Sequence, residues 1–288
     1  MLVVKEISKL KSLIQEKKAA GKTIGFIPTM GSLHAGHLSL VELAGAQVDY
    51  VVVSIFVNPT QFNDPHDLEK YPRDLERDVS QLKQTDCQLV FAPEVETIYP
   101  EPDTRHFNFG LLETVMEGKF RPGHFNGVAQ VVSKLLTIVE PDLAFFGLKD
   151  LQQVAIIKSM VKQLTLPVKI VPCPIVREAD GLAMSSRNER LVPEQRKNAA
   201  HIYRTLTEAR NKAGGMNVKD LKEWVIEQIN ANPYLETEYF EIVDDETLKS
   251  IESWDQPLNK VGCLAVFCGE VRLIDNLDFN INEEKNVH

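Results

Sequence analysis

The sequence predicts an α/β protein with a doubly wound parallel sheet, followed by a smaller α+β domain. Short, almost continuously apolar segments alternate with amphipathic segments of helix length over residues 1–176. Such strands are buried on both faces, which is typical of a parallel sheet covered by helices. From residue 177 the pattern changes to two helical segments followed by short alternating ones, which is typical of an antiparallel sheet packed on helices. We therefore expect domains of residues 1–176 and 177–288.

The predicted elements follow in order along the chain. Val154, Ile157, Val161 and Leu164 recur at helical spacing and mark one amphipathic helix. In the first domain the predicted strands are 23–28, 50–57, 88–92, 143–147 and 168–176, and the predicted helices lie near 36–47, 73–85, 127–139 and 151–164. In the second domain we expect helices 193–213 and 217–231, strands 237–244, 261–268 and 270–275, and a frayed polar tail, Asn280–His288.

Composition limits the class of protein. Of 288 residues, 43% are hydrophobic and 25% charged, which suits a globular protein with a substantial core. No apolar stretch approaches the roughly 18–20 residues of a membrane span, and the first residues lack the features of a signal peptide. The four cysteines are scattered, which fits a reducing compartment. We therefore expect a cytoplasmic location and no membrane partner. The net charge of −9 argues against a nucleic-acid partner.

The segment Pro28–His37 carries the sharpest chemical signal. A predicted strand runs into a turn with Gly31 and Gly36, which delivers His34 and His37 to the start of a helix. Helix N-termini expose backbone N–H groups and favour phosphate. Two imidazoles three residues apart lie on one face of a helix and could donate hydrogen bonds to phosphate as charge develops. A surface pair and a metal pair are the alternatives, but no further histidine or cysteine cluster with ligand spacing follows.

Other polar motifs follow the predicted strands. Because ligands of doubly wound folds bind at the carboxyl ends of strands, these positions suggest one shared site. Asn58 and Gln61 follow the second strand and suit a neutral hydroxyl, although an ordinary turn has the same composition. Lys149 follows the fourth strand where a phosphate-binding cation is expected, and Asp150 is either catalytic or a helix cap.

Two loops complete the pattern. Arg121–Val128 opens a helix with several polar groups, and Asn126 is a candidate cap. Met184–Arg187 combines two hydroxyls with an arginine, which suits phosphate, although solvated turns also contain such residues. A loop between domains can close over a bound nucleotide.

Together these segments resemble the pantoate–β-alanine ligase family of the nucleotidyltransferase superfamily, from about residue 22 to 192 and more weakly beyond. His34–His37 is similar to the HIGH signature of that superfamily and Met184–Arg187 to its KMSKS-like loop. The segments Asn58–Phe62 and Gly147–Gln153 make the similarity specific to this family. The resemblance implies a Rossmann-like first domain that binds ATP and pantoate, a C-terminal lid domain and a homodimer.

The resemblance also implies a two-step reaction with ATP as co-substrate and Mg²⁺ as cofactor. The carboxylate of pantoate would attack the α-phosphorus of ATP to give pantoyl adenylate and pyrophosphate. The amine of β-alanine would then attack the activated carbonyl and release AMP and pantothenate. No enzyme nucleophile is needed, so the protein would act by positioning and charge stabilisation.

The resemblance also implies roles for individual residues. It implies that His34, His37 and Lys149 are catalytic, while the metal ligands stay unknown. The implied ATP-binding residues are Met30, Gly31, His34, His37, Gly147, Leu148, Lys149, Asp150, Val176, Met184, Ser185, Ser186 and Arg187. The implied substrate-binding residues are Gln61, Gln153, Asn58 and His124.

Three other functions are compatible with parts of the sequence. A nucleotidyltransferase that stops after transferring a nucleotide would need more cations for a phosphorylated substrate than Gln61 and Gln153 supply. A tRNA ligase is disfavoured by the acidic balance and by the lack of a segment for anticodon binding. A regulator that has lost catalysis would be favoured if the histidine pair or Lys149 were missing, and all three residues are present.

Overall fold

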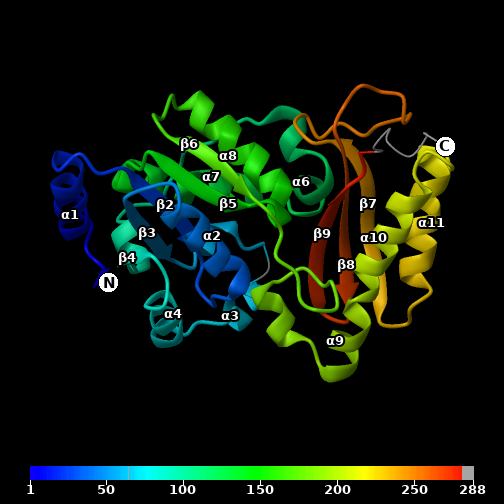
Figure 1. The fold of residues 1–288 in the computed structure, drawn as a ribbon, viewed down its shortest axis with the longest axis horizontal. Helices are drawn as coiled ribbons and strands as arrows, with labels where there is room; N and C mark the ends of the chain where they lie inside the picture. Colours follow the sequence, from blue (N-terminus) through cyan, green and yellow to red (C-terminus); the bar gives the residue numbers. More distant parts are fainter. Residues whose placement is uncertain (64, 281–288) are drawn as a thin grey trace. The chain divides into compact units, whose positions relative to one another are not determined.

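The computed structural model describes residues 1–63 and 65–280 (Figure 1), so the predicted tail beyond Asn280 lies outside the described residues. The chain forms two compact units, and each is described by itself. Unit 1 comprises Met1–Leu148 and Gln152–Val176, and unit 2 comprises Lys149–Leu151 and the chain from Arg177 onward. The functional division into a nucleotide-binding domain and a lid stays a prediction.

Unit 1 is built on a six-stranded sheet in which all pairings are parallel, as the apolar strands predict. The strand order is β1-β4-β3-β2-β5-β6. The strands are β1 (Leu2–Val4), β2 (Ile24–Thr29), β3 (Tyr50–Ile55), β4 (Cys87–Phe91), β5 (Leu143–Gly147) and β6 (Lys169–Cys173). The helices are α1 (Ile7–Ala19), α2 (Ala35–Gly45), α3 (Pro65–Lys70), α4 (Leu75–Leu82), α5 (Val95–Ile98), α6 (Met116–Phe120), α7 (His124–Val139) and α8 (Leu151–Gln163).

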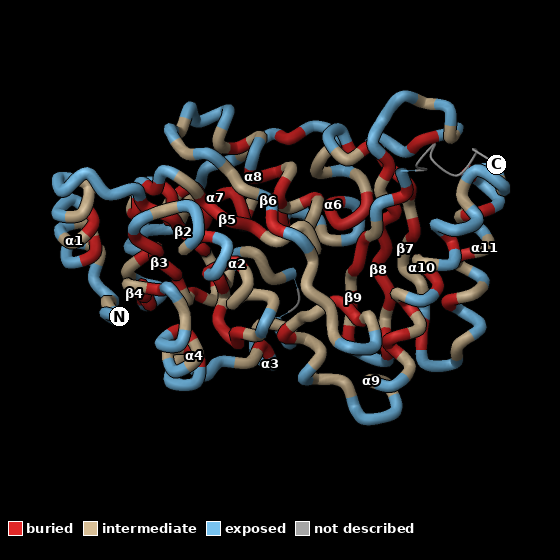
Figure 2. Tube along the Cα trace, in the orientation of Figure 1, coloured by how far each residue is buried: buried red, intermediate tan, exposed pale blue. Residues whose placement is uncertain are grey.

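Helices cover both faces of this sheet. Neighbouring strand residues point to opposite faces: Phe26 packs in one core with side chains of α1, α7 and α8, whereas Ile27 packs in another with side chains of α2 and α4. Figure 2 shows the central strands as continuously buried segments, which explains their unbroken apolar sequences. The predicted doubly wound fold is therefore confirmed.

The strand order places a topological switch point between β2 and β5. From β2 the chain continues to β3 and β4 on one side, whereas β5 and β6 lie on the other side. The helix α2 that follows β2 packs on one face, and residues of α8, which follows β5, pack on the opposite face. A crevice outside the carboxyl ends of the strands at such a point is the usual ligand position in open α/β sheets. The predicted motifs Pro28–His37 and Gly147–Asp150 begin at these two strand ends.

Unit 2 contains a three-stranded antiparallel sheet with strand order β7-β8-β9. One apolar core joins this sheet to α10 and α11 through residues such as Leu206, Leu221 and Leu264. The elements are β7 (Leu235–Asp244), β8 (Lys260–Cys268), β9 (Val271–Asp278), α9 (Pro193–Ala199), α10 (His201–Lys212) and α11 (Val218–Asn230). The predicted α+β architecture is confirmed.

Three local predictions were incomplete or wrong. The strand β1 and the helix α1 were not predicted. The strand has only three residues, two of them exposed, and so lacks the pattern of a buried strand. Asn126 is not a helix cap: α7 begins at His124 after Gly123, whose φ of +81° suits glycine. The predicted helix 193–213 is interrupted at Ala200, which ends α9 and precedes α10.

Candidate active site

The turn after β2 has an unusual backbone. Gly31 and Ser32 both have positive φ, +80° and +50°. A side chain at Gly31 would place its Cβ 2.9 Å from the carboxylate of Asp78 and 3.1 Å from Ile55. The position therefore needs glycine for its conformation and for its space.

Asp78 holds this turn in place. The residue is 1% exposed, and its carboxylate accepts hydrogen bonds from the backbone N–H groups of Ser32 (2.9 Å) and Leu33 (2.7 Å). Burial raises the pKa of Asp78, and the two backbone hydrogen bonds oppose that rise. Asp78 was missed at the sequence level. The sequence does contain a sign of its burial: Asp78 lies four positions before the buried Leu82, on the apolar side of α4.

The turn delivers His34 and His37 to the start of α2. His34 is the N-cap residue, and its Nδ1 accepts the N–H of Gly36 at 3.2 Å. Nδ1 of His37 accepts the N–H of His34 at 3.4 Å, and the two ring centroids are 4.1 Å apart. Backbone groups therefore orient both rings through Nδ1. In a neutral ring whose Nδ1 accepts, the proton lies on Nε2.

Asn58 is a buried support for Gln61. Its Nδ2 donates to Gln61 Oε1 (3.1 Å) and to the carbonyl of Gly127 (3.2 Å), while its Oδ1 accepts from the hydroxyl of Tyr99 (2.9 Å). This contact turns the Gln61 amide so that Nε2 donates to Met30 Sδ at 3.1 Å. The structure thus brings Met30, Asn58 and Gln61 together, from the ends of β2 and β3. Tyr99 also belongs to this hydrogen-bonded group, although no sequence motif indicated it.

His124, the first residue of α7, is also joined to this group. It is buried, and its Nδ1 donates to the backbone carbonyl of Gln61 at 2.8 Å. A Cβ at Gly127 would lie 2.5 Å from the carbonyl oxygen of Thr60, so glycine lets α7 approach the turn 59–61. The positions of His124 and Gln61 therefore depend on one close packing contact.

The adjacent residues Gln152 and Gln153 differ in their contacts. Gln152 is buried, accepts the N–H of Glu117 and donates to the carbonyls of Leu112 and Val115. Gln153 is half-buried, and its side chain has no hydrogen bond to any residue within 1–63 or 65–280. Gln153 and Gln61 are therefore not hydrogen-bonded to each other. Gln152 is therefore structural, whereas the amide of Gln153 is available to a ligand.

A cavity of about 530 Å³ lies at the carboxyl ends of the strands in unit 1. Met30 and Gly31 line it together with Ile55 and Phe56, which end and follow β3, and with Asp78. Its walls are mostly apolar, with charged residues such as Arg73 among them. This is a typical composition for a small-molecule site.

The predicted residues around Gly147 divide between the units. Gly147 ends β5 with open space where a Cβ would lie, and Leu148 and Val176 also belong to unit 1. Lys149 and Asp150 belong to unit 2, and their charged groups are 3.5 Å apart. Asp150 ends a short 3₁₀ turn directly before α8.

The loop Met184–Arg187 lies in unit 2 and forms the start of a 3₁₀ turn. Ser185 caps this turn: its Oγ accepts the N–H of Arg187 at 3.3 Å and its carbonyl accepts the N–H of Asn188 at 2.9 Å. Asn188 in turn donates to the carbonyl of Ala183 at 3.1 Å. The loop is thus held by local hydrogen bonds, and Ser186 is buried.

The described residues lack a metal-binding cluster and a membrane-spanning helix. Among residues 1–63 and 65–280, no three histidine, cysteine or acidic side chains are grouped so that they could hold a metal ion. No described helix is long and apolar enough to cross a membrane.

The switch point and the strand-end cavity are typical of the class of α/β proteins that bind a small molecule at the carboxyl edge of the sheet. The sequence profile described as pantoate–β-alanine ligase matches residues 2–278. The chain therefore belongs to the pantoate–β-alanine ligase family. It is a ligase that forms pantothenate from pantoate and β-alanine in an ATP-dependent reaction.

Individual relatives agree with this assignment. The chain is 54% identical to the pantothenate synthetase of Porphyromonas gingivalis, over 97% of this chain and 99% of that protein. It is 53% identical to that of Bacteroides thetaiotaomicron, with the same coverage. The crystal structure of pantothenate synthetase from Thermus thermophilus is similar with a TM-score of 0.91 and 43% identity, over 98% of this chain and all of that one. The ligase of Francisella tularensis, whose structure contains ATP (β,γ) and β-alanine, is similar with a TM-score of 0.80 and 36% identity, over 98% and 99% of the two chains.

Proposed function

We propose that the chain makes pantothenate through pantoyl adenylate. In the first step a carboxylate oxygen of pantoate bonds to the α-phosphorus of ATP, the bond to the β-phosphate oxygen breaks, and pyrophosphate leaves. In the second step the β-alanine amine bonds to the activated carbonyl carbon, AMP leaves, and the amine loses a proton to solvent. Both steps need positioning and charge stabilisation rather than an enzyme nucleophile.

The orientation of the histidine pair carries this proposal. Because Nδ1 of His34 and of His37 each accepts a backbone N–H, the neutral rings carry their protons on Nε2. These Nε2–H groups are the donors that contact the ATP phosphates, and His37 is the donor to the leaving pyrophosphate. Donors held before the reaction cost no reorganisation when charge develops.

Pantoate is held by Gln61 and Gln153. The contact with Asn58 fixes the direction of the Gln61 amide, so it recognises a hydroxyl or carboxylate with little loss of conformational freedom. Gln153 supplies a second amide that has no hydrogen-bonding partner within the part of the chain that the structure describes. Asn58 and His124 act on pantoate mainly by positioning Gln61.

The remaining ATP contacts come from residues that the family resemblance indicates. Met30, Gly31, Gly147, Leu148 and Val176 line the nucleotide site in unit 1. The resemblance also indicates Lys149, Asp150, Met184, Ser185, Ser186 and Arg187. Mg²⁺ would be held mainly by the ATP phosphates, with few protein ligands, and would neutralise phosphate charge there.

Exchange of labelled pyrophosphate into ATP tests the adenylate directly. The assay contains Mg²⁺ and pantoate, and β-alanine is withheld. We expect exchange that depends on pantoate, because pantoyl adenylate and bound pyrophosphate can reverse to ATP. ATP binding without exchange would reject the adenylate route.

We further expect a cytoplasmic homodimer that forms through the N-terminal domain. Sedimentation tests the homodimer, and cell fractionation tests the location.

A further inference from the structure

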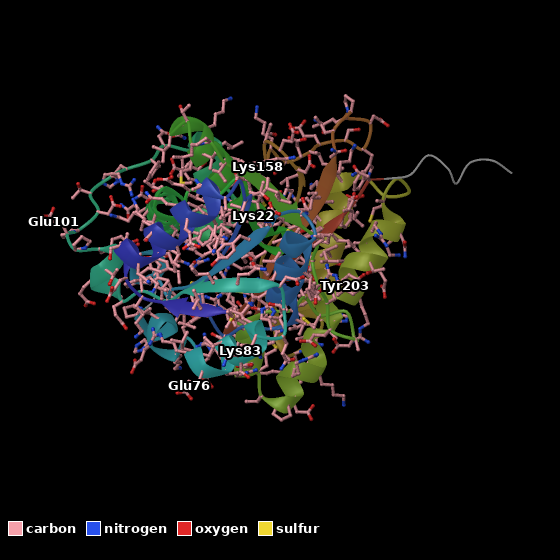
Figure 3. All side chains as sticks on the ribbon, turned by 60° about the vertical axis from the view of Figure 1, so that its left-hand side comes forward. Lys22, Glu76, Lys83, Glu101, Lys158 and Tyr203 are labelled. Carbon is pink, nitrogen blue, oxygen red and sulfur yellow. The ribbon has the colours of Figure 1, made fainter. Side chains whose placement is uncertain are left out.

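Arg177 forms a buried ion pair within unit 2. Its Nη1 and Nη2 donate to the two carboxylate oxygens of Asp275 at 2.6 and 3.0 Å, and the side chain of Asp275 is 2% exposed. The guanidinium also lies 4.0 Å from the centre of the Tyr203 ring in α10, which is labelled in Figure 3. A bidentate, stacked arginine has a fixed orientation that lysine cannot reproduce.

The same arginine supports the segment that leads into Met184–Arg187. Arg177 pairs with Ala183 in an antiparallel bridge, and its Nη1 donates to the carbonyl of Gly181 at 3.1 Å. Gly181 has a φ of +94°, and a Cβ there would lie 2.1 Å from the ring of Tyr203. Arg177 therefore holds the turn 177–183 at both of its ends. The loop Met184–Arg187 begins directly after this turn.

The residue next to Asp275 is hydrogen-bonded to Lys149. Asn276, adjacent to Asp275 in β9, donates from Nδ2 to the backbone carbonyl of Lys149 at 3.0 Å. The backbone of Asn276 is itself held, because its N–H donates to Asp275 (2.7 Å) and its carbonyl accepts from Arg177 (3.1 Å). Lys149 belongs to unit 2, whereas α8, which follows it, belongs almost entirely to unit 1. Asn276 is thus a link between the ion pair and Lys149.

We propose that Arg177, Asp275 and Asn276 form a positioning network that holds Lys149 and the loop Met184–Arg187 in one fixed arrangement for ATP. This proposal rests on the proposed function of Lys149. None of the three network residues needs to touch ATP. Their effect on the reaction passes through the backbone of Lys149 and through the turn 177–183.

The variant Asn276→Ala tests the link, because it removes the hydrogen bond to Lys149 and leaves the backbone contacts of the ion pair in place. We expect the Kd for Mg²⁺ and a non-hydrolysable ATP analogue, measured by calorimetry, to rise about fivefold, the effect of losing one hydrogen bond. The KM for pantoate should change less than twofold. The matched control is Asn232→Ala, which removes a side-chain hydrogen bond to Asn198 elsewhere in unit 2 and should leave both values unchanged.

A double-mutant cycle separates positioning from a general loss of structure. In a Lys149→Ala background, Asn276→Ala should weaken ATP binding by less than twofold, since nothing remains to be positioned. A further fivefold loss, or an equal rise in the KM for pantoate, would overturn the proposal while leaving the proposed function intact. If Lys149→Ala alone binds ATP like the parent, the function proposed for Lys149 fails and this inference fails with it.

Folding of each variant is checked by thermal unfolding. If Asn276→Ala does not fold, Asn276→Asp replaces the donating amide with an acceptor of the same size. We expect the same selective loss of ATP affinity from this variant. Unchanged ATP affinity in a folded Asn276→Asp protein would overturn the proposal.

Discussion

At the residue scale, the proposed donor His37 makes the clearest prediction. His37→Ala should lower the rate of pantoate-dependent pyrophosphate exchange by about 10²–10³, the usual effect of losing one transition-state donor. The fold should be kept, because the hydrogen bond that His37 accepts from His34 is long, at 3.4 Å. Exposed His106 provides the matched control. An unchanged rate in folded His37→Ala, with His106→Ala also unchanged, would remove His37 from the mechanism.

The two glutamines predict a difference between substrates. Gln61→Ala and Gln153→Ala should each raise the KM for pantoate more than the KM for ATP, because their amides are proposed to bind pantoate. Gln152→Ala is the contrasting variant: it breaks three hydrogen bonds from a buried side chain to the backbone and should lower stability instead. Steady-state kinetics with each substrate varied in turn measures the effect. Equal rises in both KM values would indicate that the glutamines are structural.

Asp78 extends the argument to a residue that holds the turn before His34 in place. Asp78→Asn keeps the size of the side chain but presents an amide N–H to one of two backbone donors, from Ser32 or Leu33. A buried donor without an acceptor costs about 1–3 kcal/mol of unfolding free energy. Urea unfolding measures this loss. Since the turn delivers His34, the exchange rate should fall as well, and a stable variant with a normal rate would contradict this function of Asp78.

At the scale of elements, the loop between α5 and α6 is hydrogen-bonded both to α7 and to Asn58. Gln130 of α7 donates to the carbonyls of Asp103 (2.9 Å) and Arg105 (2.8 Å). Tyr99, at the start of this loop, donates to Asn58. Glu101 lies at the outer side of the loop, exposed to solvent (Figure 3). The loop therefore connects the helix that carries His124 with the support of Gln61.

Asp103 makes the stability of this loop depend on pH. The hydrogen bond from Arg105 lowers the pKa of Asp103 to about 2, and the side chain is 3% exposed. A lowered pKa stabilises the fold above the ordinary value of 3.8, and this contribution is lost as the pH falls towards 2. It amounts to about 2 kcal/mol. The unfolding free energy of the parent should therefore fall more steeply than that of Asp103→Asn between pH 5 and 2, and parallel curves would contradict the ion pair.

The elements show why sequence reasoning succeeded in some places and failed in others. Strands β2, β3 and β4 are buried on both faces, so their apolar segments could be recognised without tertiary information. The strand β1 depends on pairing with β4, and α7 is preceded by a glycine of positive φ, Gly123, rather than by a usual cap. The motif residues were visible because they follow strands. Asp78 and Asn276 were not found, because their importance lies in contacts 45 and 127 positions away in sequence.

At the scale of the whole molecule, an acidic chain is proposed to bind a polyanion. The net charge is −9, so ATP must be attracted by local groups rather than by the overall field. The proposed local groups are the helix start at His34–His37, Lys149 and the loop Met184–Arg187.

The proposed ATP contacts predict the pattern of protection on binding. Mg²⁺ with a non-hydrolysable ATP analogue should slow amide hydrogen exchange in residues 30–37 and also in residues 184–188, because ligand contacts reduce local opening. Peptides from α11 should exchange as before and serve as an internal control, since no proposed contact lies there. Protection limited to residues 30–37 would exclude Met184–Arg187 from the ATP site. The effect of Asn276→Ala would then have to pass through Lys149 alone, which the double-mutant cycle measures separately.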